Sequence, residues 1–136
     1  MRILVCGGRD FPSSSQQRQS LRKALNKAHE STPITLLIHG GARGVDLATA
    51  PWARDKNIAI KEFPAQWKQY GRSAGHRRNA QMLTKGEPQG VIAFPGARGT
   101  SNMVAQAKKA CVPVWFPLGS DWLIESQRPW QTQDSA

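Results

Sequence analysis

Short apolar runs recur along the chain and are separated by longer segments of mixed polarity. The runs at 2–6, 34–38, 90–94 and 112–116 are almost continuously apolar, which is typical of strands whose two faces are both buried in a parallel sheet. The run at 58–63 alternates apolar and charged residues and predicts a more exposed strand. The pattern therefore indicates five strands.

The segments between these runs carry apolar residues at helical spacing, and serines precede or open several of them, which favours a helix start. The predicted helices span 13–28, 45–56, 73–85 and 101–110. Five strands that alternate with helices predict an α/β fold, a single Rossmann-like doubly wound domain with a mainly parallel sheet of about five strands.

Two segments fit this pattern less well. Pro51 interrupts the helix predicted from residue 45, so we expect a kink or a late start near residue 50. The segment 64–71 has no clear period and predicts a loop pinned by Trp67 and Tyr70. These two aromatic residues either cover a ligand or fill the core.

The length of 136 residues suits one domain. We expect a nucleotide-binding domain over 1–120 and a polar, partly disordered C-terminal extension over 121–136. Trp122 and Trp130 in this extension are candidates for the interface of a homodimer.

The chain lacks the sequence features of a membrane or metal protein. No apolar run approaches the roughly 20 residues that cross a bilayer, and no signal-peptide pattern follows Met1. We therefore expect a cytoplasmic protein without a membrane partner. Cys6 and Cys111 lie in or beside apolar runs and are predicted to be buried reduced thiols, and no metal or cofactor is expected.

The formal net charge of +10 favours an anionic partner. A solvated basic surface is the alternative explanation, since the basic residues are spread along the whole chain. Five arginines adjoin glycines or predicted loops, where a guanidinium can contact a phosphate. They are Arg9, Arg43, Arg77, Arg78 and Arg98.

Two glycine-rich turns follow strands and share the order Gly-Ala-Arg-Gly. One is Gly41-Ala42-Arg43-Gly44 and the other is Gly96-Ala97-Arg98-Gly99. Turns between a strand and a helix can aim backbone N–H groups at a phosphate, and both turns are expected at the carboxyl edge of the sheet. Neither the P-loop pattern nor the complete dinucleotide fingerprint is present, which argues against a kinase, an ATPase or an ordinary dehydrogenase.

Four motifs together resemble the SLOG superfamily and, within it, the YspA-type branch related to YpsA. They are Gly7-Gly8-Arg9-Asp10-Phe11, the segment 39–46, the segment 74–79 and the segment 95–100. The resemblance covers roughly 2–116. It implies a Rossmann-like sheet, a nucleotide or nucleotide-derived ligand and a homodimer, because the superfamily includes the LOG phosphoribohydrolases and the single-stranded-DNA-binding DprA proteins.

The resemblance also implies roles for individual residues in the last motif. Gly96, Gly99 and Thr100 match the LOG phosphate loop Pro-Gly-Gly-x-Gly-Thr-x-x-Glu. Ala97 replaces its second glycine, and Met103 stands where LOG hydrolases have their glutamate. A thioether cannot act as a general acid. Ligand binding is therefore better supported than LOG-type hydrolysis.

Other candidates for chemistry are few. Arg78 matches the arginine of the LOG Arg-Lys pair, with Asn79 in place of the lysine. Asp10 and Asp46 are acids near the predicted site that either bond ribose hydroxyls, act as catalytic acids or cap turns. The catalytic candidates are thus Asp10, Asp46 and Arg78, and His39 is a hydrogen-bonding residue or a base.

The sequence predicts a protein that binds a nucleoside phosphate or an ADP-ribose-like ligand, as a sensor or a processing domain. One alternative is a nucleoside phosphate hydrolase, and another is DprA-like binding of single-stranded DNA, which the charge favours. The predicted ligand-binding residues are Gly7, Gly8, Arg9, Asp10, Gly40, Gly41, Ala42, Arg43, Gly44, Asp46, Arg78, Asn79, Pro95, Gly96, Arg98, Gly99 and Thr100.

Overall fold

Five parallel strands form the centre of the fold, in the order β3-β2-β1-β4-β5. The computed structural model describes residues 1–41, 43–118 and 129–130. The predicted α/β class with a five-stranded parallel sheet is confirmed. The strand order reverses at β1, which lies between β2 and β4, and ligands of such sheets bind beside this reversal. The strands are β1 (Arg2–Cys6), β2 (Leu36–His39), β3 (Ala59–Glu62), β4 (Gly90–Ala93) and β5 (Val114–Trp115).

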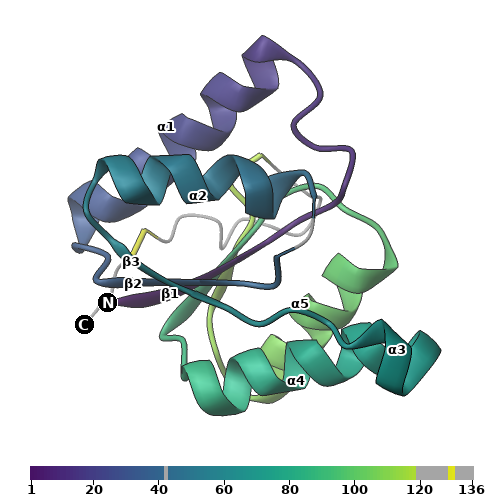
Figure 1. The fold of residues 1–136 in the computed structure, drawn as a ribbon. Coiled ribbons are helices and arrows are strands. Elements are labelled where there is room, and N and C mark those ends of the chain that lie inside the picture. The colour runs from purple at the N-terminus through teal and green to yellow at the C-terminus, as the bar shows by residue number, and fades with distance from the viewer. Residues whose placement is uncertain (42, 119–128, 131–136) are drawn as a thin grey trace.

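Helices cover both faces of the sheet. Figure 1 shows α1 and α2 on one face and α4 and α5 on the other, with α3 at the end of α4. The short helices α3 and η1 lie where the sequence predicted a loop over 64–71, so that prediction was wrong in part. The helices are α1 (Ser15–Ser31), α2 (Val45–Asp55), α3 (Trp67–Tyr70), η1 (Gly71–Ser73), α4 (Ala74–Gly86) and α5 (Arg98–Lys109).

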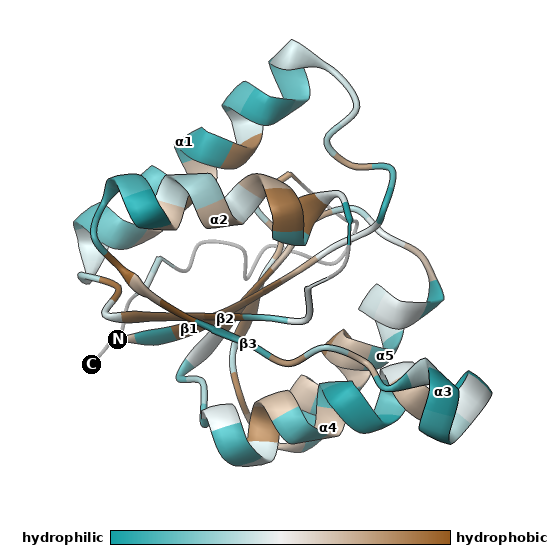
Figure 2. Cartoon of the chain, in the orientation of Figure 1, coloured by the Kyte–Doolittle hydropathy of each residue, from teal (hydrophilic) through white to brown (hydrophobic). Residues whose placement is uncertain are grey.

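Alternate residues of the central strand supply two separate cores. Ile3 and Val5 pack in the core beneath α1 and α2, whereas Leu4 and Cys6 pack in the core beneath α4 and α5. Figure 2 shows β1 and β2 mostly in the hydrophobic colours and α1 mostly in the hydrophilic ones. Leu4 is fully buried, so Leu4→Ala should cost about 2–5 kcal/mol of stability.

Helix α1 begins with a side-chain cap, as its serines predicted. The Ser14 hydroxyl accepts a hydrogen bond from the backbone N–H of Gln17 at 3.1 Å. Leu21, Leu25 and Ala28 form the buried stripe of the helix. The helix ends at Ser31, three residues beyond the predicted end.

Helix α2 runs through Pro51, so the late start expected near residue 50 is wrong. Pro51 is exposed, and its ring removes only the hydrogen bond to the carbonyl of Leu47, which also lies on the exposed side. Thr49 and Trp52 are buried, and the Thr49 hydroxyl donates to the Val45 carbonyl at 2.7 Å. Packing of this inner face therefore holds the helix together.

The ends of α4 and α5 differ from the predictions at two positions. Helix α4 ends at Gly86, one residue beyond the predicted end, and a Cβ at Gly86 would lie 3.0 Å from the Ile38 side chain of β2. Glu87 makes the left-handed turn. Cys111 is exposed, and the prediction that it is buried was wrong, because it follows α5 with a φ of 60° and precedes β5.

Trp130, within the predicted C-terminal extension, packs against β5 and bonds the end of α1. Its ring lies edge-on to Trp115 at 6.1 Å between centroids, and its backbone N–H donates to the Ser31 hydroxyl at 3.1 Å. Trp122 and most of the predicted extension lie outside the described residues. In the described part of the chain, no helix is both long enough and apolar enough to cross a bilayer.

Candidate functional site

Three loops meet at the carboxyl edge of the sheet, after β1, β2 and β4. The backbone N–H of Gly8 donates to the Pro95 carbonyl at 2.8 Å, and the Val45 N–H donates to the Gly8 carbonyl at 3.3 Å. The β1 loop is thus held between the other two loops. This arrangement places the two Gly-Ala-Arg-Gly turns at one edge, as the sequence predicted for strands that run in parallel.

Close packing of these loops accounts for several of their glycines. A Cβ at Gly8 would lie 2.9 Å from the Cα of Gly96, and a Cβ at Gly44 would collide with the Gly8 carbonyl. Gly44 also has a φ of 78°, which favours glycine. Gly99 differs, since a Cβ there would meet nothing within 4 Å. Contacts within the described chain therefore do not explain the glycine at position 99.

Three backbone N–H groups of the β2–α2 loop and the start of α2 are bonded within the chain. The Gly40 N–H donates to Oδ2 of the buried Asp46 at 3.2 Å, and the Gly41 N–H donates to Nδ1 of His39 at 2.9 Å. The N–H of Val45, at the start of α2, is bonded to Gly8. Asp46 and His39 thus have structural roles in the loop. Ala42, which the sequence placed in this site, lies outside the described residues.

The first turn of α5 presents its N–H groups differently. The preceding residue, Ala97, offers no side-chain cap, and the turn contains no acidic residue. In the described part of the chain, Ser101 is the first α5 residue whose N–H bonds to a carbonyl, that of Ala97 at 3.0 Å. Pro95 through Gly99 are exposed. An uncapped, exposed helix start has the partial positive charge and free donors that suit an anion.

Helix α5 begins at Arg98, three residues before the predicted start. Gly99 and Thr100 therefore belong to the helix rather than to the loop before it. Ala97 is not a capping residue, so the start of α5 was predicted too late in the chain.

Arg78 extends from α4 to the β2–α2 loop. Its Nη1 donates to the Gly40 carbonyl at 2.7 Å, and its Nε donates to Oδ1 of Asn79 at 3.1 Å. Burial lowers the pKa of Arg78, while the nearby Asp46 carboxylate and Cys6 oppose that shift. The guanidinium remains charged at neutral pH. The Arg78 side chain thus links α4 to the β2–α2 loop and places a positive charge beside that loop.

Asn79 supports the first turn of α5. Its side chain is buried, and Nδ2 donates to the Gly99 carbonyl at 3.2 Å and to Oδ1 of Asn102 at 3.0 Å. Gln106 donates to the same Asn102 oxygen at 2.7 Å. Asn102 and Gln106 were not predicted from the sequence, because amides on helix faces carry no chemical signature until the helices are packed.

Met103 is only 1% exposed and lies in the apolar core beneath α4 and α5. The position that carries the glutamate in LOG hydrolases is thus filled by a core residue here. Cys6 lies in the same core, and burial together with the Asp46 carboxylate raises the pKa of its thiol far above the ordinary range. Neither side chain is poised for acid–base chemistry.

Four other predicted site residues are exposed on the same edge. Arg9 and Asp10 follow β1, Arg43 precedes α2, and Arg98 opens α5. Among the residues that the structure describes, no three histidine, cysteine, aspartate or glutamate side chains gather as a metal site would require.

Two comparisons with known proteins show which family the chain resembles. The sequence model of the YspA, cpYpsA-related SLOG family matches residues 1–70. The chain is also 32% identical over 120 residues to the Gene 61 protein of Mycobacterium phage D29, which covers 83% of this chain and 93% of the phage protein.

Proposed function

Because the chain belongs to the YspA, cpYpsA-related SLOG family, we propose that it binds a nucleotide or nucleotide-derived ligand through a phosphate at the start of α5. The observation that carries this proposal is the first turn of α5. It is exposed and uncapped, it contains no acidic residue, and its Gly99 has open space around it. These properties allow a phosphate to approach the backbone closely.

The other Gly-Ala-Arg-Gly turn supports the ligand site indirectly. In the β2–α2 loop that contains this turn, the N–H groups of Gly40 and Gly41 already have acceptors, and so does the N–H of Val45. A phosphate there would have to displace these bonds. We therefore assign the phosphate to 96–100, and we assign the β2–α2 loop the role of holding Gly8 and Arg78 in place.

The positive charge of nearby arginines also favours a phosphate at 96–100. Arg98 is exposed in the first turn itself, and Arg43 is exposed at the same edge. Arginine forms forked hydrogen bonds with phosphate oxygens. Asp10, which is also exposed at this edge, is the acid we assign to the ribose hydroxyls.

A charge placed in the α5 turn tests the proposal. Gly99→Asp adds a carboxylate where the phosphate would bind, and its Cβ has room. The matched control is Gln16→Asp, because Gln16 is the second residue of α1 just as Gly99 is the second residue of α5, and Gln16 is exposed. Both variants change the net charge equally and put an acid at a helix start, which favours the helix.

The measurement is the shift in melting temperature with AMP, GMP, CMP, UMP and ADP-ribose. A ligand at 100 times its dissociation constant adds about 2.7 kcal/mol to the stability of the parent. We expect at least one compound to stabilise the parent and Gln16→Asp equally, and Gly99→Asp to lose the response. A response retained in Gly99→Asp places the site elsewhere, and no response in the parent refutes the proposal.

A further inference from the structure

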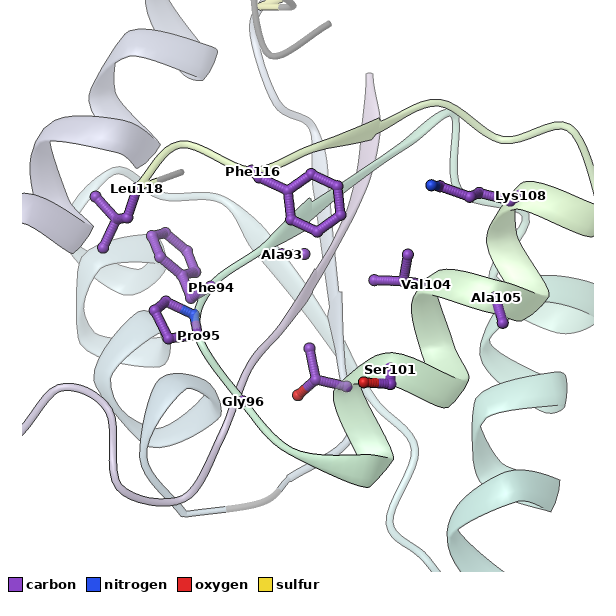
Figure 3. A pocket seen from close by; sticks show the side chains of 11 residues that line it. Ala93, Phe94, Pro95, Gly96, Ser101, Val104, Ala105, Lys108, Phe116 and Leu118 are labelled. Atoms are coloured by element: carbon purple, nitrogen blue, oxygen red, sulfur yellow. The ribbon is translucent and has the colours of Figure 1, made fainter. Parts of the chain in front are cut away.

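A pocket of about 390 Å³ opens beside the first turn of α5, between that helix, the end of β4 and the segment after β5. Figure 3 shows the rings of Phe94 and Phe116 on one side and Val104, Ala105 and Ser101 of α5 on the other. The volume lies within the range of small-molecule sites, roughly 300–1,000 Å³. The pocket is therefore large enough for a heterocyclic ring.

The pocket is continuous with the proposed phosphate site. Gly96 and Thr100 line the pocket and also belong to the turn that would hold the phosphate. A ligand anchored by its phosphate at this turn can therefore extend directly into the pocket.

The walls indicate the kind of group that would enter. Val104 and Phe116 line the pocket with apolar and aromatic surface, and an aromatic ring stacks well on a flat heterocycle. Phe94 is buried behind them, and its ring stacks on Phe11 at 5.8 Å between centroids. Lys108 also lines the pocket, but a charged group would lose its hydration against the apolar walls. An uncharged planar ring is the best match.

Two hydroxyls supply hydrogen bonds at the same place. Elsewhere on the helices, the hydroxyls of Thr49 and Thr84 donate to the carbonyl four residues earlier, at 2.7 and 3.0 Å. The hydroxyls of Thr100 and Ser101 make no such bond in the described part of the chain, although both lie on α5 and line the pocket. They are free to bond the edge of a ring or a sugar.

We infer that this pocket receives the base of the nucleotide, so that the turn at 96–100 holds the phosphate and the outer face of α5 holds the ring. This inference rests on the proposed function. It identifies the preferred ligand class as molecules in which a base and a phosphate are joined by a single ribose.

The test compares two probes and a variant that narrows the pocket. Ribose 5-phosphate carries the phosphate without a base, and the four nucleoside monophosphates carry both. Ala105→Phe fills the pocket from an exposed position of α5, and Ala110→Phe is the matched control on an exposed residue at the other end of that helix. Ala105→Leu, a smaller change, serves if the phenylalanine lowers stability.

We expect the parent to bind at least one nucleoside monophosphate about 5- to 100-fold more tightly than ribose 5-phosphate, as a stacked base contributes. Ala105→Phe should lower the affinity for that nucleotide to the affinity for ribose 5-phosphate. It should leave the affinity for ribose 5-phosphate unchanged, and Ala110→Phe should change neither affinity. If the nucleotides bind but the base adds nothing, or Ala105→Phe has no effect on them, the pocket inference is refuted and the phosphate site stands. If neither probe binds the parent, both proposals fail.

Discussion

The side-chain amide of Asn79 donates a hydrogen bond to the backbone carbonyl of Gly99 at 3.2 Å and so joins α4 to the first turn of α5. The same amide nitrogen bonds Asn102, 3.0 Å away. A buried side chain from one helix thus fixes the turn that we propose to hold the phosphate.

Replacing this amide should weaken both the fold and the site. Asn79→Ala leaves the Asn102 oxygen and the Gly99 carbonyl without their shared donor, which should lower the free energy of unfolding by about 1–3 kcal/mol. Urea unfolding measures the change, and Gln81→Ala on the exposed side of the same helix is the control. Equal stability in the two variants would mean that Asn79 does not support the turn.

Gly96, in the loop before α5, and Gly99, in the first turn of α5, should respond to alanine in opposite directions. Gly99→Ala should raise stability by about 0.4–1 kcal/mol, because its Cβ meets nothing within 4 Å and the unfolded chain becomes less flexible. Gly96→Ala should lower stability, because its Cβ would collide with the Thr100 hydroxyl and lie 2.8 Å from the Gly8 nitrogen. Thermal unfolding of both variants without ligand measures the signs. The same sign in both would contradict the packing described for these loops.

Met103→Glu should destabilise the domain in a pH-dependent way. The side chain lies in an apolar core, and burial raises the pKa of a carboxyl group. The folded-state pKa then exceeds the unfolded value of about 4.3, so the folded state holds its proton more strongly and stability falls as the pH rises above that value. Near pH 7 the loss should be on the order of 3–5 kcal/mol.

Unfolding in urea at pH 4 and pH 7 checks this expectation, with Met103→Leu as the volume-conserving control. A glutamate variant whose stability does not fall with pH would show that the position reaches solvent or a cationic partner.

The two thiols should differ sharply in reactivity. Burial raises the pKa of Cys6, so the unreactive protonated form persists, whereas Cys111 is exposed. In Ellman's assay at pH 8, one thiol per chain of the native parent should react quickly, whereas almost no thiol of native Cys111→Ser should react. Both proteins should react fully at Cys6 in denaturant. Fast labelling of native Cys111→Ser would contradict the burial of Cys6.

The apolar runs predicted four strands of the sheet, because parallel strands buried on both faces leave a strong signal in the sequence. The alternating run at 58–63 predicted β3, which is mostly exposed. The start of α5 was not predictable from the same signals, since Ala97 is no cap and Gly99 is a poor helix former. Helix α3 was missed because four residues are too few to show a period. Such short elements depend on packing rather than on local preference.

The candidate site was predictable as a meeting of loops but not in its details. The order of strands and glycine-rich turns predicted which loops share an edge. Which N–H groups remain available depends on the bonds of Asp46 to Gly40 and of Gly8 to Val45, and these exist only in the folded chain. The two Gly-Ala-Arg-Gly turns are therefore equivalent in sequence but differ in their hydrogen bonds.

The most direct test of the phosphate site is a ¹H–¹⁵N NMR titration of the ¹⁵N-labelled protein with the nucleoside monophosphates and with inorganic phosphate. The backbone amides of Arg98, Gly99 and Thr100 should show the largest shifts with both probes, because hydrogen bonding to an anion acts directly on these N–H groups. The amides of Gly40 and Gly41, which already have acceptors, should shift little. Largest shifts at Gly40 and Gly41, or no saturable shift at the start of α5, would contradict the assignment of the phosphate to this turn.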